Sequence, residues 1–186
     1  MSGQSRRAVR AVAGRVARLA AVARGRRAAE PQAERAEAGQ PPTAGSASVA
    51  AAVSAAVTAV PEGSRTVRVP DRLPPVPVDQ DQLERVLVAM VRAAWLRTPP
   101  GTRVLVQAAA AAGEGRPDVL EVRVTDRGPN LAGEAKSWLL ADPSGSDGGL
   151  PAAVREFKAS GGGRITLEDN PAGGLVLVLT LPVVTC

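Results

Sequence analysis

Polar and apolar residues alternate along a stretch near the middle of the chain, residues 117–130. Leu120, Val122 and Val124 alternate with charged or hydroxyl-bearing side chains, which is the period-two pattern of a half-buried β-strand. Asp126 falls in phase with the apolar set. The pattern therefore predicts a carboxylate that points toward the core where the strand ends.

That carboxylate has two interpretations. Placing it at an apolar strand end costs free energy unless hydrogen-bond donors surround it. The simpler interpretation is an aspartate that caps the turn predicted by Gly128 and Pro129. The other interpretation is a binding group, because two more glycine clusters follow at residues 146–151 and 160–165.

Residues 79–98 have the spacing of an amphipathic helix. Asp79 or Asp81 is expected to cap its N-terminus. The apolar positions that recur at helical spacing are Leu83, Val86, Leu87, Met90 and Ala94.

Shorter patterns complete an α/β order. Further helices are expected over residues 46–60 and 151–160, and further strands over 66–69, 102–111, from 164 onward and over 173–180. The 102–111 strand should form a hairpin with the strand that leads to Asp126. These elements predict a two-layer α/β sandwich, with a mixed, mainly antiparallel sheet and about three helices on one face.

The order of these motifs resembles the ATP-binding domain of sensor histidine kinases, in the GHKL superfamily with its Bergerat fold. The resemblance covers roughly residues 46 to 182. It rests on a helix ending in Thr-Pro, a D-x-G turn, the clusters SDGGLP and SGGGRI, and a last strand ending in Leu-Pro. The run EDNPAGGL is most similar to the potassium-sensing type of two-component kinase.

The resemblance implies a nucleotide site. Asp126 would accept a hydrogen bond from the exocyclic amine of adenine, and Asn130 stands where the family has a second glycine. A helix N-terminus behind the SDGGLP glycines would suit phosphate. The expected nucleotide-binding residues are Asp126, Gly128, Asn130, Gly148, Gly149, Leu150, Arg92 and Arg97.

The family's magnesium ligands are missing. Alignment of the helix ends places Ala89 and Ala93 at two family asparagines, of which the second coordinates magnesium, and Leu96 at a lysine. Magnesium requires oxygen ligands, and a methyl group offers none. Arg92 and Arg97 would partly replace the lost positive charge, or would lie on a solvated helix face. Residues 131–147 would form a short ATP lid.

Composition adds three expectations. Aromatic residues make up 2% of the chain, so Val, Leu and Ala must build the core. There is no histidine, which excludes the family's phosphoacceptor from this chain. The single cysteine, Cys186, indicates a reducing, cytoplasmic compartment, and no apolar run reaches the length of a transmembrane segment.

The positive charge belongs to the N-terminus. The net charge is +5, but residues 1–29 carry eight arginines and no acid, so the remainder is mildly acidic. We therefore divide the chain into a basic helix (1–30), a linker (31–45) and a histidine-kinase-like domain (46–186). The arm is an ordinary amphipathic or partly disordered segment, a remnant of a dimerisation hairpin that forms a homodimer, or a surface for nucleic acid or acidic lipid.

Three functions remain open. The first is a degenerate, histidine-kinase-like domain in two-component signalling, a pseudo-kinase that binds ATP weakly or acts as a binding or dimerisation module. The second is an active ATP-dependent histidine or anti-sigma-type serine kinase with an atypical site. The third is a structural or nucleic-acid- or lipid-associated protein that works through its basic arm.

Overall fold

The computed structural model describes residues 45–111, 119–141 and 149–183, all within one compact unit. The expectations for the basic arm, for most of the linker and for Gly148 lie outside these residues. The helices are α2 (Val49–Val57), η1 (Glu62–Ser64), α3 (Gln80–Arg97), α4 (Gly133–Leu140) and α5 (Gly149–Ala159). The strands are β1 (Arg65–Arg68), β2 (Val104–Ala111), β3 (Val119–Thr125), β4 (Arg164–Asp169) and β5 (Leu175–Pro182).

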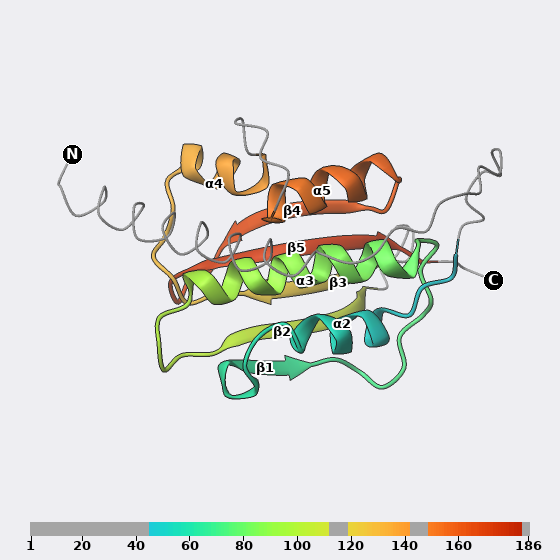
Figure 1. Cartoon of the computed structure of the whole chain (residues 1–186), viewed down its shortest axis with the longest axis horizontal. Helices are drawn as coiled ribbons and strands as arrows, with labels where there is room; N and C mark the ends of the chain where they lie inside the picture. The colour runs from blue at the N-terminus through green and yellow to red at the C-terminus, as the bar shows by residue number, and fades with distance from the viewer. Residues whose placement is uncertain (1–44, 112–118, 142–148, 184–186) are drawn as a thin grey trace, which may run out of the picture. The chain divides into compact units, whose positions relative to one another are not determined.

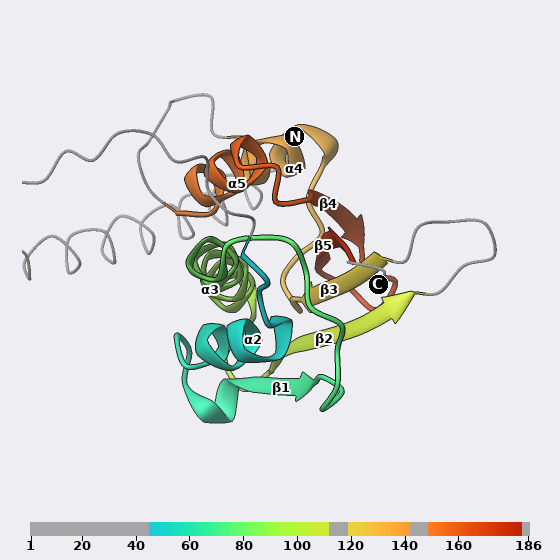
Figure 2. The ribbon, with the colours of Figure 1, turned by 90° about the vertical axis from the view of Figure 1, so that its right-hand side faces the viewer.

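The five strands form one mixed sheet in the order β1-β2-β3-β5-β4. Only β1 and β2 pair in parallel, and the other three pairings are antiparallel. The α-helices cover one face of this sheet, and α3 lies between α2 and α5 (Figures 1 and 2). The predicted two-layer α/β sandwich and the β2–β3 hairpin are therefore confirmed.

Helix α3 is the central element of the helical layer. The carboxylate of Asp79 accepts a hydrogen bond from the backbone N–H of Gln82 at 2.9 Å, which caps the first turn. All five residues of the predicted apolar stripe are buried. The helix forms here because its stripe faces the sheet while its charged positions remain at the surface.

The sheet presents its apolar positions to these helices. On β3, Leu120, Val122 and Val124 are fully buried, as the alternation predicted. Strand β5, which pairs with β3 and β4, is buried along Leu175–Leu179. Within the described core, Phe157 is the one buried aromatic residue, so aliphatic side chains supply most of the packing.

The segment expected to form a lid contains a helix as far as the structure describes it. Helix α4 begins at Gly133 and leaves Trp138 59% exposed. Helix α4 buries no residue fully, and its sequence has no clear apolar stripe. Hydrophobic periodicity therefore did not predict this helix. None of the described helices is long and apolar enough to cross a membrane.

Candidate nucleotide site

Asp126 lies where β3 ends beside β5, and its side chain is directed into the protein. Its backbone N–H donates to the carbonyl of Leu175 at 2.9 Å, which extends the strand pairing by one residue. The residue is 1% exposed. The sequence prediction of an inward-pointing carboxylate at this strand end is confirmed.

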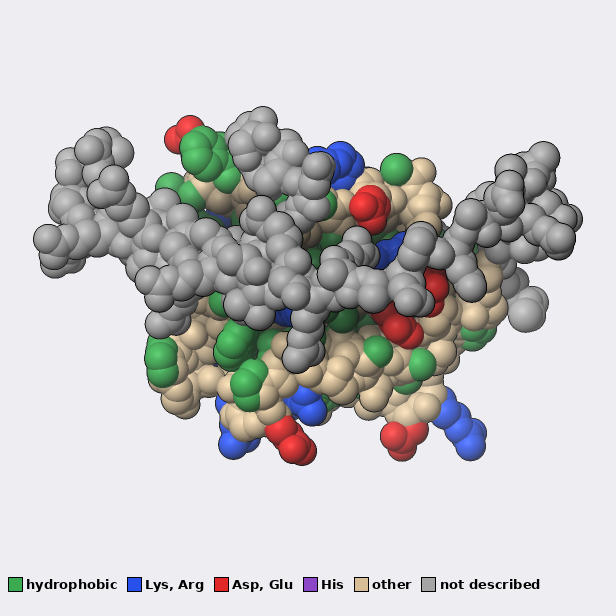
Figure 3. Space-filling view, in the orientation of Figure 1, with side chains coloured by type: hydrophobic (Ala, Val, Ile, Leu, Met, Phe, Trp, Pro, Cys, Tyr) green, Lys and Arg blue, Asp and Glu red, His purple; other side chains and the backbone are tan. Residues whose placement is uncertain are grey.

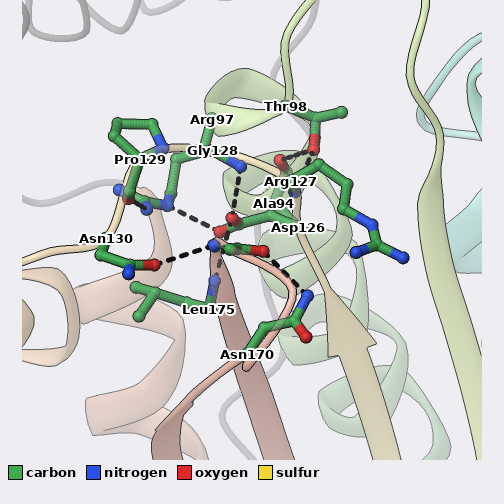
Figure 4. A network of polar contacts seen from close by, with 12 residues as sticks. Ala94, Arg97, Thr98, Asp126, Arg127, Gly128, Pro129, Asn130, Asn170 and Leu175 are labelled. Carbon is green, nitrogen blue, oxygen red and sulfur yellow. Dashed lines mark hydrogen bonds and ion pairs between the residues drawn. The ribbon is translucent and has the colours of Figure 1, made fainter.

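Three donors surround the Asp126 carboxylate (Figure 4). The Nε of Arg97 donates to Oδ2 at 2.7 Å, and the backbone N–H groups of Gly128 and Leu175 donate to Oδ1 at 2.8 and 3.1 Å. A carboxylate offers about four acceptor positions, so three of them are used. The bond from Gly128 is an Asx turn, which confirms that Asp126 caps the turn after β3.

Arg97 is the charged partner of this carboxylate. Its side chain is 6% exposed, and its Nη2 donates to the carbonyl of Pro129 at 2.7 Å. The interpretation of Arg97 as part of a solvated helix face is therefore wrong. Arg97 follows Ala94 by three residues and so continues the buried stripe of α3. Arg92 lies on the exposed side of the same helix.

Two further contacts connect the turn after β3 to its neighbours. The side-chain oxygen of Asn130 accepts from the backbone N–H of Gly174 at 3.0 Å. The hydroxyl of Thr98 donates to the carbonyl of Ala94 at 2.9 Å and accepts from the backbone N–H of Arg127 at 3.3 Å. The end of α3, the turn after β3 and the β4–β5 turn are therefore held together by hydrogen bonds.

Two glycines are required by the packing around this ion pair. A Cβ on Gly128 would lie 2.6 Å from the carbonyl oxygen of Arg97, and one on Gly174 would lie 2.6 Å from Oδ1 of Asp126. Gly174 also has φ +95°, which other residues rarely adopt. The glycines of the family pattern thus have a structural reason here that involves no ligand.

The remaining expected residues are placed apart from this network. Gly149 has φ +79° at the start of α5, and Leu150 is 4% exposed within the core. Among the described residues, the structure brings together Arg97, Asp126, Gly128 and Asn130, and it leaves Arg92, Gly149 and Leu150 outside their hydrogen bonds.

The arrangement does not fit ATP and magnesium in the way the resemblance implies. Adenine would need an accessible acceptor on Asp126. The carboxylate of Asp126 is instead buried and forms an ion pair with the buried side chain of Arg97. Ala89 and Ala93 offer methyl groups where oxygen ligands would be needed. Within the described ranges, no three His, Cys, Asp or Glu side chains are grouped so that they could hold a metal ion.

The Arg97–Asp126 pair was missed by sequence reasoning, although a signal was present. Both residues continue an apolar periodicity, one on α3 and one on β3. A buried charge requires a partner of opposite charge or a set of donors. Two residues of opposite charge on facing apolar stripes could therefore have been matched before the structure was known.

Comparison with known proteins agrees with this fold. No protein-family model matches the sequence. The sensor protein KdpD of Rathayibacter rathayi is 34% identical over 117 residues, which cover 59% of this chain and 13% of that protein. The chain thus spans about an eighth of the length of this curated relative.

Solved structures of histidine kinases have a similar three-dimensional arrangement. A mycobacterial sensor histidine kinase, MprB, matches with a TM-score of 0.58 at 21% identity, over 74% of this chain and 95% of that one. The histidine kinase domain of the E. coli osmosensor EnvZ matches with a TM-score of 0.58 at 21% identity, over 80% and 94%. The resemblance is confirmed: this chain has the fold of the histidine-kinase-type ATP-binding domain, the Bergerat fold of the GHKL superfamily.

Proposed function

We propose that this chain is a non-catalytic, histidine-kinase-like module of sensor-kinase signalling, a pseudo-kinase domain that acts by binding other proteins. The observation that supports this proposal is the buried Arg97–Asp126 ion pair. In the family, the matching aspartate serves adenine. Here its carboxylate is 1% exposed and is bound to a cation of its own chain.

The position of the family's magnesium ligand supports the same conclusion. Phosphoryl transfer depends on metal and cationic groups that stabilise the charge of the transferring phosphoryl group. Ala93 takes the place of the magnesium-coordinating asparagine, and the only arginine of α3 near Asp126 is used in the ion pair. A domain without the metal ligand and with its cation occupied is poorly suited to catalysis.

Residual nucleotide binding would involve phosphate rather than adenine. The start of α5 behind Gly149 could donate backbone N–H groups to a phosphate. Such contacts are weak without adenine recognition and without magnesium. We therefore expect any affinity for ATP to be low and to be shared by phosphates that carry no base.

Isothermal titration calorimetry of the whole chain with ATP, ADP and tripolyphosphate, each with and without magnesium, tests this proposal. We expect ATP to bind no more tightly than tripolyphosphate, because the adenine acceptor is inaccessible. Magnesium should not strengthen whatever binding is seen. Heat that tripolyphosphate reproduces would reflect phosphate contacts and not a nucleotide site.

Asp126→Asn serves as the diagnostic variant. It preserves an oxygen that can accept from Gly128 and Leu175 while removing the negative charge. Saturable ATP binding to the wild type that magnesium enhances and Asp126→Asn abolishes would contradict the proposal. That result would favour an active kinase with an atypical site.

The names of the relatives indicate which kind of partner the module would bind. KdpD is named a sensor protein, and MprB is named a sensor histidine kinase. We propose that residues 1–30 join two copies of the chain, and that the Bergerat domain contacts a signalling protein. Analytical ultracentrifugation of the whole chain, compared with a chain that lacks residues 1–43, tests the first part. A monomeric whole chain at about 50 μM would contradict it.

A further inference from the structure

Three arginines line one hollow on the sheet that neither Arg97 nor Asp126 lines. The hollow has a volume of about 410 Å³. Its lining residues are Thr66, Arg68, Thr102, Arg103, Leu105 and Arg127. None of the six is acidic, so the hollow concentrates positive charge.

Strand register places these lining residues on three neighbouring segments of the sheet. Thr66 pairs with Leu105 across β1 and β2, and Leu105 pairs with Thr125 across β2 and β3. Val104 and Val106 are buried against the helices, so Leu105 faces the opposite side of the sheet.

The arginines follow the same alternation. Arg68 lies two residues after Thr66, Arg103 two residues before Leu105, and Arg127 two residues after Thr125. Because β2 and β3 are antiparallel, Arg103 and Arg127 lie at the same end of the sheet. Figure 4 shows the side chain of Arg127 pointing away from Asp126, although the two residues are adjacent in the chain.

The three arginines are exposed, and none of them forms an ion pair with another residue in the part of the chain that the structure describes. On the helix-bearing side of the protein, both acidic and basic side chains are visible among the coloured atoms (Figure 3). Like charges on one surface repel each other. An anion that enters a cluster of arginines without carboxylates reduces this repulsion and lowers the free energy.

We propose that this hollow binds a small phosphorylated molecule with at least two phosphate groups. Guanidinium groups bind phosphate through paired N–H donors, and the hydroxyls of Thr66 and Thr102 can add further donors. Leu105 provides an apolar floor for the non-phosphate part of the ligand. A volume of a few hundred Å³ suits a small molecule.

The site goes beyond the proposed function and does not depend on it. The adenine-type site and the hollow use different side chains, since Arg97 and Asp126 do not line the hollow. A chain that fails to bind ATP through Asp126 can still bind oligophosphate here. Conversely, an active kinase could lack this second site.

Calorimetric titration of the whole chain with tripolyphosphate at 150 mM NaCl tests the site. We expect a Kd below about 1 mM. The double variant Arg103→Gln/Arg127→Gln should raise this Kd about tenfold or more, because each hydrogen bond to a charged group contributes about 1.5–3 kcal/mol.

The arginine-rich N-terminus also attracts anions, so the control must match the change in charge. Arg85→Gln/Arg155→Gln removes two exposed arginines from α3 and α5 and alters the net charge equally. Its effect on the Kd should stay below about threefold, since only long-range attraction is lost. Equal weakening by the two double variants, or no tripolyphosphate binding by the wild type, would overturn the proposal.

A second titration distinguishes the source of the phosphate. A single-stranded DNA of 12 thymidine nucleotides carries the same chemical group in a polymer. If Arg103→Gln/Arg127→Gln weakened DNA binding while tripolyphosphate did not bind, the hollow would be part of a nucleic-acid surface and the small-ligand proposal would be wrong. Tripolyphosphate binding that depends on the two arginines supports it, with or without DNA binding.

Discussion

At the scale of single residues, the ion pair between Arg97 and Asp126 connects the end of α3 to the end of β3. Both side chains are nearly inaccessible to water, so both ions have lost their hydration. Such a pair adds little net stability compared with apolar residues, but removing one partner leaves a buried charge uncompensated. The pair therefore fixes the geometry of the site more than it stabilises the fold.

Arg97→Met should lower the free energy of unfolding by about 3–5 kcal/mol, because it leaves the Asp126 carboxylate buried without its cation. Urea denaturation followed by circular dichroism measures this change. Arg92→Met, on the exposed side of the same helix, should change stability by less than about 0.5 kcal/mol.

The double variant Arg97→Met/Asp126→Asn separates the charge effect from lost packing. It removes both charges and keeps an acceptor for Gly128 and Leu175. We expect it to recover at least about 1 kcal/mol relative to Arg97→Met alone. Strictly additive effects of the two substitutions would show that the pair is not coupled.

Gly174→Ala should be more destabilising than the neighbouring Gly173→Ala. Both glycines have positive φ, +95° and +92°, so both substitutions carry a backbone cost of about 1–2 kcal/mol. A Cβ on Gly174 would also collide with the backbone and carboxylate of Asp126, whereas a Cβ on Gly173 would meet nothing within 4 Å. Comparing their urea midpoints isolates the collision, and equal midpoints would contradict the close approach.

At the scale of elements, α3 positions Arg97 because side-chain hydrogen bonds fix both ends of the helix. Asp79 caps its N-terminus, and the hydroxyl of Thr98 connects its last turn to the segment after β3. A shift of this helix would move Arg97 away from Asp126. The capping of α3 therefore affects the ion pair as well as the helix.

Asp79→Ala should cost about 1 kcal/mol of stability, since the N–H of Gln82 loses its acceptor. Asp81→Ala is the matched control, because Asp81 lies in the first turn without acting as the cap. It should lose only about 0.3 kcal/mol from the interaction with the helix dipole. Thermal unfolding distinguishes the two variants. A larger effect of Asp81→Ala would mean that the cap has been assigned to the wrong residue.

At the scale of the whole molecule, the described residues contain an extensive buried core and lie within one compact unit. We propose that the Bergerat domain begins near residue 46 and folds without the basic arm. An arm that is not required for folding would be free to serve association.

Deleting residues 1–43 should leave a single cooperative unfolding transition, with a urea midpoint within about 0.3 M of the whole chain. The physical reason is that the described residues hold an extensive buried apolar cluster of their own, from Ala47 to Leu181. Differential scanning calorimetry and urea titration measure the transition. A broad transition, or loss of near-native circular dichroism, would place the arm within the folding unit.

The sequence by itself determined most of the described elements and the fold class. The stripe on α3 and the alternation on β3 each depend on neighbours within a few residues, and hydrophobic periodicity records that local environment directly. The burial of Asp126 followed from the same local phase. Helix α4 escaped prediction because its packing gives it no fully buried face.

Only the tertiary structure decided what the site contains. Arg97 and Asp126 are 29 residues apart, and their contact depends on how α3 packs across the end of β3. Arg68, Arg103 and Arg127 line one hollow because the β1–β2 and β2–β3 pairings bring their three segments side by side. Local patterns place a side chain on a face of its own element. Which opposite charge or ligand it meets there is determined by long-range packing, which no single stretch of sequence encodes.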